Sequence, residues 1–414
     1  MSMGWFRQLI LIGILLFASL TWDLSVLDRL IAALVIVLVI AWLWNRFSIG
    51  GIGFERSLML DRVNVGDNVI EQITLTNHSR FPKLWIEVLD RSNLPGHTAG
   101  RVLSLRGKNA LTWDVETLAI RRGKFTLGPS AVTAGDPFGL FTSYEMLPVS
   151  HELLVFPATV DVSGIHLPTA RLDGGHAAPR RSMPSSATFN SIREYQPGDP
   201  MNRIAWSATA HRGQLMVKEF DPDPTSDLWI LLDLNDDGQF DLHHRENIPG
   251  AYRHLNTTVE YIVSIGASLA NVELGNGKKV GLILNRQNPI RIEPDNSERQ
   301  WFRIAETLAV VTSAGSRSIS ESLTADHRRF SRNSGLVVIT ADPRSDWVAA
   351  GAALVERLVP VTAVIVDAGG EGQDEISPLL HRLAAARIHV HRYTTHTAVS
   401  SNTSRVPLDD EHVT

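Results

Sequence analysis

Hydrophobic and polar positions follow three different patterns along the chain. Two long apolar runs come first, at residues 9–20 and 30–43. From about residue 54 to 157, short stretches alternate with period two between Gly, Pro, Asn and Asp, which is typical of half-buried strands. After residue 226, continuous apolar stretches alternate with helical patterns. That alternation indicates a mostly parallel sheet covered by helices.

The two apolar runs predict a membrane hairpin. A helix needs roughly 20 residues to cross the hydrocarbon core of a bilayer, and segments 5–22 and 28–47 reach that length with their interfacial residues. Tryptophans stand near the ends of both segments, where the membrane interface would lie. A cleaved signal peptide is the alternative for the first run, but Ala18-Ser19-Leu20 is a poor cleavage site and a second run follows closely. We therefore expect residues 1–50 to form a transmembrane helical hairpin.

The charges beside the hairpin predict its orientation. Arg7 precedes the first run, and Arg46 and Arg56 follow the second, whereas the loop between the runs carries two aspartates and one arginine. Because basic residues stay on the cytoplasmic side, both ends of the hairpin and everything after residue 50 are expected in the cytoplasm. The expected location is the inner or plasma membrane.

The period-two stretches predict an antiparallel β-sandwich of immunoglobulin-like type over residues 51–160. Its clearest strands are expected at residues 69–76, 83–89, 110–115 and 124–127. The next segment, 161–190, is rich in Gly, Pro, Ser and Ala without periodicity. That composition is typical of a flexible linker or loop.

Residues 227–395 predict a three-layer α/β domain of Rossmann-like type. Buried strands are expected at 228–234, 280–284, 336–340, 361–366 and 388–392, with a strand at 290–292 beside the second of these. Helices are expected at 257–273, after Ser297, at 346–358 after Ser345, and from Ser377-Pro378, because caps or N-terminal prolines stand at those starts. The tail, 396–414, is expected to be disordered.

Oxygen-bearing side chains follow two of the predicted strands. The first strand runs into alternate oxygen-bearing side chains at Asp233, Asn235 and Asp237. The strand predicted at 336–340 is followed by Asp342. The carboxyl ends of parallel strands meet at one edge of a sheet, so these groups could hold one Mg²⁺ ion. An EF-hand is excluded, because its twelfth position would be His244 rather than glutamate. The alternative is a polar strand-end loop that binds no metal.

Composition removes several classes of function. The 414 residues carry 39 basic and 44 acidic side chains, which gives no overall basic signal for nucleic acid. With no cysteine, disulfides, thiolate metal sites and cysteine nucleophiles are excluded. There is no Gly-x-Ser-x-Gly, Walker A or His-Glu-x-x-His sequence, and His211, His243, His244 and His254 fit no nucleophile–base pattern. We therefore do not expect an enzyme.

The segment 191–226 contains the most distinctive set of residues. Its polar and turn positions are Arg193, Tyr195, Pro197, Gly198, Asp199, Trp206, Lys218 and Glu219. In this order they resemble the signature of a bacterial membrane-protein family, domain-of-unknown-function family 58. Arg122-Gly123-Lys124-Phe125 and Asp136-Pro137-Phe138-Gly139-Leu140 look like its upstream landmarks.

The family resemblance implies an architecture and partners. It implies a hairpin anchor, a β-domain and a von Willebrand factor A-like domain. It also implies MoxR-type AAA+ ATPases and transglutaminase-like membrane proteins as neighbours. The metal motif of A domains, Asp-x-Ser-x-Ser, is only partly matched, because Asn235 and Asp237 replace both serines. For the separate threonine of that motif, Thr307 and Thr312 are both candidates.

Three functions remain open, and we expect the first. It is a membrane-anchored, non-enzymatic binding or scaffold protein that acts with a MoxR-type ATPase in the assembly or maturation of envelope or other protein complexes. The alternatives are metal-dependent adhesion or ligand binding, and a hydrolase. Within the signature, Arg193, Asp199 and Arg212 are interpreted as ion-pair and turn residues, and Trp206 as a buried anchor.

Overall fold

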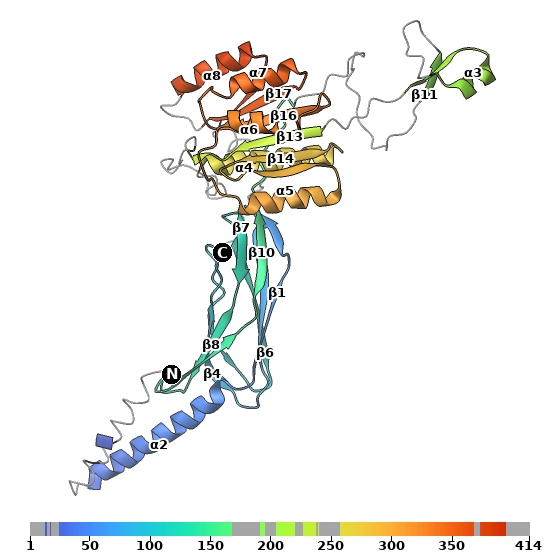
Figure 1. The fold of residues 1–414 in the computed structure, drawn as a ribbon. Helices are drawn as coiled ribbons and strands as arrows, with labels where there is room; N and C mark the ends of the chain where they lie inside the picture. The colour runs from blue at the N-terminus through green and yellow to red at the C-terminus, as the bar shows by residue number, and fades with distance from the viewer. Residues whose placement is uncertain are drawn as a thin grey trace, which may run out of the picture. The chain divides into compact units, whose positions relative to one another are not determined.

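The computed structural model divides the chain into two compact units, residues 1–156 and 157–414 (Figure 1). It describes residues 13, 14, 17, 25–167, 191–194, 204–219, 227–236, 239, 257–367 and 373–394. The tail 396–414 and nearly all of the first apolar run lie outside these residues. We call the first unit, with its helix, the β unit, and the second the α/β unit.

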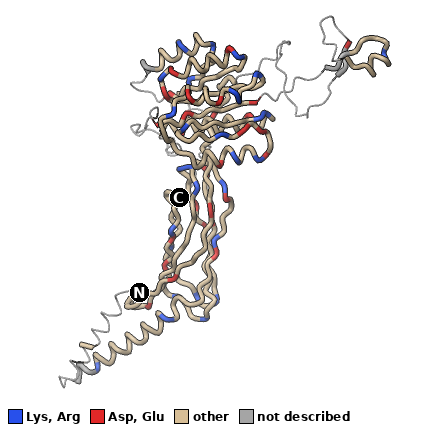
Figure 2. Tube along the Cα trace, viewed as in Figure 1, with Lys and Arg blue, Asp and Glu red and all other residues tan. Residues whose placement is uncertain are grey.

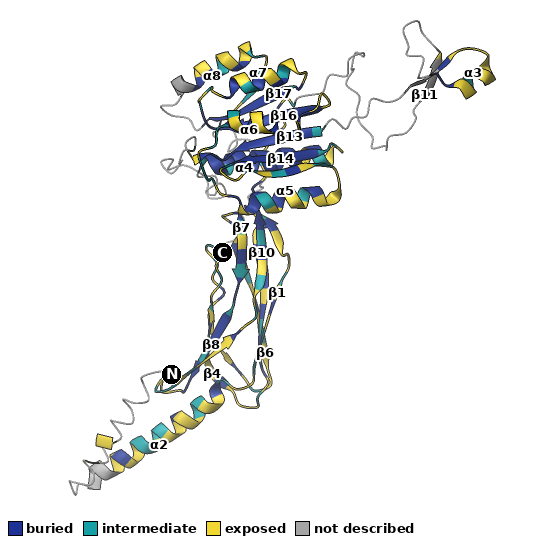
Figure 3. Cartoon of the chain, viewed as in Figure 1, coloured by how far each residue is buried: buried dark blue, intermediate teal, exposed yellow. Residues whose placement is uncertain are grey.

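The β unit begins with a long apolar helix, α2 (Ser25–Ser48). Within it, residues 29–48 have a mean hydropathy of 2.2 over 20 residues, and only 17% of that window is buried. Among the described residues this is one helix that is long and apolar enough to cross a membrane. Figure 3 shows it largely exposed. Length and composition of this kind also fit a signal sequence, so the second span and the orientation stay predictions.

The last turn of α2 is fixed to the β unit by a buried lysine. Lys83 Nζ donates to the carbonyl oxygens of Phe47 and Gly50, with an N–O distance of 2.9 Å to Gly50. These are carbonyls that a helix end leaves without a partner. Phe81 also stacks on Phe47 with ring centroids 5.6 Å apart, and meets Trp44 edge-on. The helix therefore ends inside the packing of the β unit.

Short β-strands form three sheets in the rest of this unit. One sheet has the order β1-β3-β6 and another β5-β4-β8-β9, both antiparallel. The third, β2-β10-β7, pairs β10 parallel to β2 and antiparallel to β7. The strands are β1 Ile52–Leu58, β2 Arg62–Asn64, β3 Asn68–Asn77, β4 Lys83–Asp90, β5 Arg101–Leu105, β6 Ala110–Leu118, β7 Gly123–Leu127, β8 Ser130–Gly135, β9 Thr142–Leu147 and β10 His151–Phe156.

The core of the β unit lies between the first two sheets. Ile73 and Trp113 from β3 and β6 pack with Ile86 and Val132 from β4 and β8. Burial alternates along β3, as the period-two pattern requires. The mostly β character of this region is thus confirmed, with strands at all four of the positions predicted above.

The α/β unit is built on a six-stranded sheet with the order β15-β14-β13-β16-β17-β18. All neighbours are parallel except the edge pair β14 and β15. The strands are β13 Asp227–Asp233, β14 Val280–Asn285, β15 Ile290–Asp295, β16 Ser334–Thr340, β17 Val361–Asp367 and β18 His389–Thr394. The helices are α4 Thr258–Gly275, α5 Glu298–Val310, α6 Ile319–Asp326, α7 Val348–Glu356 and α8 Gln373–Ala385.

Both faces of this sheet are covered. Ile230 of β13 belongs to the core that contains residues of α4 and α5. Its neighbours Trp229 and Leu231 belong to the core formed with α6, α7 and α8. Because successive side chains of a strand point to opposite faces, a strand buried on both sides is apolar throughout. The continuous apolar runs of the sequence have this cause.

Helix starts agree with the sequence less closely than the strands do. Thr257 caps α4 as predicted, since its hydroxyl accepts from the Glu260 N–H at 3.3 Å. Ser297 precedes α5 without a side-chain cap bond; its hydroxyl donates to Asp295 instead. Helix α8 begins at Gln373, so the start predicted at Ser377 is wrong, and Pro378 lies inside the helix. Helix α6 was not predicted.

The segment that follows the β unit packs on the α/β core. Val162 and Ile165 are buried there, and the Val160 N–H donates to the Ser268 hydroxyl at 2.9 Å. The apolar side chains in this stretch explain why it is packed, although its Gly and Pro content suggested a linker from residue 161. The rest of the expected linker, 168–190, lies outside the described residues.

Candidate functional site

The carboxyl ends of three neighbouring parallel strands carry a buried polar cluster. It consists of Asp233 at the end of β13, Asn285 at the end of β14 and Thr340 at the end of β16. The Thr340 hydroxyl donates to Asp233 Oδ2 at 2.7 Å, and Asn285 Nδ2 donates to Asp233 Oδ1 at 3.1 Å. Each of the three side chains is 1% exposed or less. Asp233 is therefore the centre of a hydrogen-bonded strand-end cluster.

A second set of bonds ties this cluster to the loops that surround it. Asn285 also donates to the Arg317 carbonyl at 2.9 Å and accepts from the Ser322 hydroxyl at 2.7 Å. Gln239 donates to the Asp233 carbonyl at 3.1 Å and accepts from Thr258 at 2.6 Å. The start of α4 and the start of α6 are thus held to the ends of the strands.

Burial dominates the electrostatics of Asp233. Removal of the carboxylate from water raises its pKa to about 6, because the hydrogen bonds from Thr340, Asn285 and the Asn235 N–H only partly offset the desolvation. The negative charge of Asp342 raises the pKa further. At neutral pH, ionised Asp233 therefore lowers the free energy of unfolding.

Asp342, the second predicted aspartate, is paired with an arginine. The Arg344 guanidinium lies 2.6 Å from Asp342 Oδ2 and also donates to Oδ1 at 3.0 Å. The Asp342 N–H donates to the Thr340 hydroxyl at 2.9 Å. Thr340 therefore connects the two aspartates, as acceptor from one and donor to the other. This connecting residue and Asn285 were missed from the sequence, although Thr340 ends one predicted strand and Asn285 directly follows another.

These contacts bear on the predicted Mg²⁺ site. Both oxygens of Asp233 and both of Asp342 already accept hydrogen bonds, so a cation would share these carboxylates with Thr340, Asn285 and Arg344. Among the described residues, no group of three His, Cys, Asp or Glu side chains is arranged to hold a metal. Asp237 lies outside the described residues. The Mg²⁺ site therefore stays a prediction.

The two candidate threonines do not join the cluster through any described bond. The Thr307 hydroxyl donates to the Arg303 carbonyl within α5 at 2.7 Å, and Thr312 is an exposed residue after that helix. The threonine that does bond Asp233 is Thr340. The reason is topological, since β16 is the direct neighbour of β13.

The signature segment forms a separate small element. Strand β11 (Ser191–Glu194) pairs antiparallel with β12 (Met216–Glu219), which aligns Arg193 with Val217. Helix α3 (Trp206–Arg212) lies between the two strands in sequence and ends at Gly213 in the left-handed conformation, φ 71°. Lys218 and Glu219 belong to β12. Tyr195, Pro197, Gly198 and Asp199 lie outside the described residues.

The prediction that Trp206 is a buried anchor is wrong. Its side chain is 68% exposed at the start of α3. An exposed aromatic contributes little to folding, so Trp206→Ala should change the melting temperature very little, corresponding to about 0.5 kcal/mol or less. Scanning calorimetry of the purified protein tests this. A loss of several kcal/mol would restore the buried-anchor interpretation.

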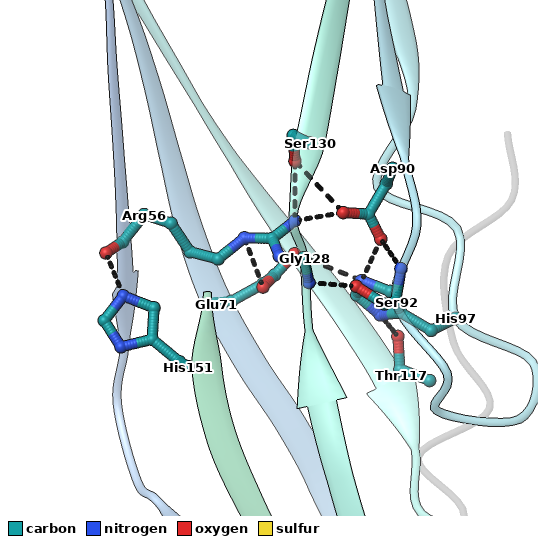
Figure 4. Close-up of polar contacts among 9 residues, drawn as sticks. All are labelled: Arg56, Glu71, Asp90, Ser92, His97, Thr117, Gly128, Ser130 and His151. Atoms are coloured by element: carbon teal, nitrogen blue, oxygen red, sulfur yellow. Dashed lines mark hydrogen bonds and ion pairs between the residues drawn. The ribbon is translucent and has the colours of Figure 1, made fainter. Parts of the chain in front are cut away.

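The β unit contains a second buried polar cluster (Figure 4). No sequence motif predicted it. Arg56 on β1 lies 3.3 Å from Glu71 on β3 and 2.5 Å from Asp90 on β4. His97 lies 3.3 Å from each of the same two carboxylates, and its Nδ1 is 2.9 Å from the Thr117 hydroxyl. The four charged side chains are between 0 and 6% exposed. Two cations thus face two anions inside the unit.

The pKa values of this cluster reflect mutual stabilisation. Burial alone would lower the pKa of His97, but its hydrogen bonds and charge contacts with Asp90 and Glu71 outweigh burial and raise the pKa to about 9. Burial also opposes ionisation of Asp90, yet bonds from His97, Ser92 and Arg56 hold its pKa below the usual value. The two cations and the two anions offset one another's charge inside the unit.

The stability of the β unit should depend on pH through His97. A histidine whose folded pKa exceeds its unfolded value of 6.5 contributes stability that is complete below pH 6.5 and is lost as pH rises toward 9. Calorimetric unfolding of the protein should therefore show a melting temperature that falls across this window. His97→Gln should flatten the slope. A slope that is unchanged in this variant would assign the pH dependence to other groups.

Fold and cluster together define a protein with an apolar helix, a β-rich unit and a doubly covered α/β sheet with polar strand ends. Residues 191–371 match a family model described as "Protein of unknown function DUF58". The chain carries a domain of this family, and the resemblance drawn from the signature residues is confirmed.

A curated relative of this chain is also described as uncharacterised. The chain is 26% identical over 238 residues to the "Uncharacterized protein YeaD" of Bacillus subtilis (strain 168), which covers 55% of each of the two proteins. The chain thus spans about half the length of that relative.

Solved structures resemble only parts of the chain. The CARDB domain of the PF1109 protein from Pyrococcus furiosus matches at 14% identity and TM-score 0.20, over 26% of this chain and 96% of that one. Proximal thread matrix protein 1 of the mussel byssus matches at 14% identity and TM-score 0.27, over 37% of this chain and 40% of that one. Likeness at this level carries no functional argument.

Proposed function

We propose that this protein is a membrane-anchored, non-enzymatic binding or scaffold protein with a cytoplasmic α/β domain. In this proposal the first apolar run and α2 form a two-helix hairpin, the β unit is an immunoglobulin-like sandwich, and the α/β unit is a von Willebrand factor A-like domain. The protein would act with a MoxR-type AAA+ ATPase, beside a transglutaminase-like membrane protein, in the assembly or maturation of envelope or other protein complexes.

The observation that carries this proposal is the strand-end cluster. Its functional groups are engaged with one another: Asp233 with Thr340 and Asn285, and Asp342 with Arg344. Such bonds fix the loops of this edge in one arrangement, which favours a binding surface, because a preorganised surface loses less entropy when a partner docks. In parallel α/β sheets, ligands bind beyond the carboxyl ends of the strands, which is where this cluster lies.

A pair of charge reversals at the two ends of one strand, β16, tests the partner surface. Asp346 is exposed in the loop after β16, and Arg332 is exposed just before the same strand, at the opposite edge of the sheet. The tagged full-length protein is purified in detergent from its native membranes, and co-purified proteins are identified by mass spectrometry. We expect a AAA+ ATPase with the unaltered protein, less of it with Asp346→Lys, and an undiminished amount with Arg332→Glu. Absence of any such ATPase contradicts the proposal.

The second candidate is metal-dependent ligand binding through Asp233, Asn235, Asp237 and Asp342, with Mg²⁺ as the cation. The observation that favours it is the raised pKa of Asp233, because a bound cation would offset the cost of burying this carboxylate. Calorimetric titration of the protein with Mg²⁺ tests this candidate, with Asp233→Asn as the control. Heat of binding that is lost in the variant supports the metal, and no binding removes it.

A further inference from the structure

One end of the β unit combines exposed apolar side chains with exposed basic ones. We call it the anchor-proximal end, because α2 enters there. It is made of four segments: residues 45–53, 78–85, 104–110 and 136–144. The described contacts of the β unit itself bring these segments together, so no other part of the chain is needed to define the surface.

Backbone and side-chain bonds hold the segments side by side. The Lys108 N–H donates to the Ser79 carbonyl at 2.9 Å. Asn77 donates to the carbonyls of both Phe81 and Arg106, at 2.8 and 3.1 Å. A methyl group added to Gly135 would lie 3.3 Å from the Trp85 ring, which places the end of β8 beside β4. Helix α2 contacts β8 and β9.

Large apolar side chains are exposed on this end. Phe138 is 57% exposed, Leu84 51% and Phe81 50%. Phe81 in turn touches the rings of Trp44 and Phe47 in α2. The apolar surface is therefore continuous with the exposed apolar side of the candidate membrane helix. Aromatic residues beside a membrane helix are typical of the bilayer interface.

The charges of this end have one sign. Arg46, Arg80, Arg106 and Lys108 are exposed. The four segments contain a single acidic residue, Asp136, which is buried and accepts the N–H groups of Phe138 and Phe141 at 2.8 and 2.6 Å. Acidic residues return toward the other end of the same strands. Figure 2 marks basic positions where α2 meets the β unit.

We infer that the anchor-proximal end is a second membrane-contact surface, which lies against the headgroups of anionic phospholipids beside the point where α2 leaves the bilayer. Basic side chains near an anionic leaflet gain from its negative potential, and the aromatic and aliphatic side chains among them enter the interface. This inference rests on the proposal that α2 is a membrane anchor. It adds that this end of the β unit touches the membrane directly.

Single labelled cysteines test the contact, because the chain has no cysteine of its own. The full-length protein is reconstituted in nanodiscs that contain phosphatidylglycerol, with a nitroxide at one of three positions: Phe138→Cys at the proposed surface, Ile36→Cys in α2, or Leu118→Cys as an exposed apolar control on β6. Collision with oxygen, compared with collision with a water-soluble nickel chelate, reports immersion in lipid. We expect Ile36 and Phe138 to favour oxygen several-fold over Leu118.

The outcomes separate the surface from the anchor. If Ile36 is immersed and Phe138 behaves like Leu118, the anchor stands and the contact surface is overturned. If all three positions are aqueous, the anchor itself fails. A Phe138 label protected from both reagents would mean that protein covers this end, which also overturns the inference.

The charge requirement has its own test. In discs of phosphatidylcholine alone, or in the variant Arg80→Gln, Arg106→Gln, Lys108→Gln, the oxygen preference at Phe138 should fall toward the Leu118 value while Ile36 stays immersed. A preference at Phe138 that is insensitive to both changes would overturn the choice of anionic lipid as the partner.

Discussion

Replacing Arg56 with methionine should destabilise the β unit by about 3–5 kcal/mol, the cost of leaving buried charges without their partner. The guanidinium is fully buried between Glu71 and Asp90. Without it, His97 is the remaining cation that faces both carboxylates within this cluster. Scanning calorimetry of the detergent-solubilised protein is the appropriate measurement, because two compact units can unfold in separate transitions.

The matched control is Arg121→Met, which removes an exposed arginine from the same unit. This change should cost about 0.5 kcal/mol or less. Only the transition assigned to the β unit should move in Arg56→Met. Equal small shifts in the two variants would show that water reaches the cluster and screens its charges.

The second large effect concerns Asp233 and has the opposite sign. The folded pKa of about 6 exceeds the unfolded value of 3.8, so folding takes up a proton between these values and stability falls as pH rises through them. Asp233→Asn cannot ionise and escapes this loss. Its stability relative to the unaltered protein should therefore improve by about 2 kcal/mol between about pH 4 and pH 7.5.

Asp326→Asn provides the control for this experiment. Asp326 is equally buried, but it binds Arg291 and Arg329 at 2.8 and 3.1 Å. Its neutralisation should lower stability at pH 7.5, because it breaks ion pairs. If Asp233→Asn also lowers stability at pH 7.5, the carboxylate must be compensated there by a positive partner, and a bound cation becomes the leading explanation.

Strands and layers of this protein could be predicted from the sequence because their cause is local. A strand buried on both faces must be apolar throughout, as β13 is. Helix starts are less reliable, since a capping residue has other partners to choose from. Ser345, expected to cap a helix, accepts a hydrogen bond from Arg382 instead. Propensity could not reveal that competition.

Only part of the candidate site could be predicted from the sequence, for a similar reason. Asp233 and Asp342 stand out as carboxylates after apolar runs, but their partners are set by strand order, which places β14 and β16 on either side of β13. Trp206 was wrongly predicted to be buried, because the size of an aromatic side chain does not indicate whether other residues pack over it. The Arg56 cluster was missed because its members come from three strands and a loop, and carry no shared motif.

The bond between Lys83 and the end of α2 has a mechanical consequence. A helix that ends in a flexible tether can change its tilt without moving what it carries. Here Lys83 of β4 donates hydrogen bonds to carbonyls at the end of the helix. The ring of Phe81 also stacks on Phe47 in the last turn. A helix tilts when the hydrophobic thickness of its bilayer changes. In the proposed membrane-anchored protein, the joint would convert such a tilt into a rotation of the β unit, and the helix would act as a lever as well as a tether.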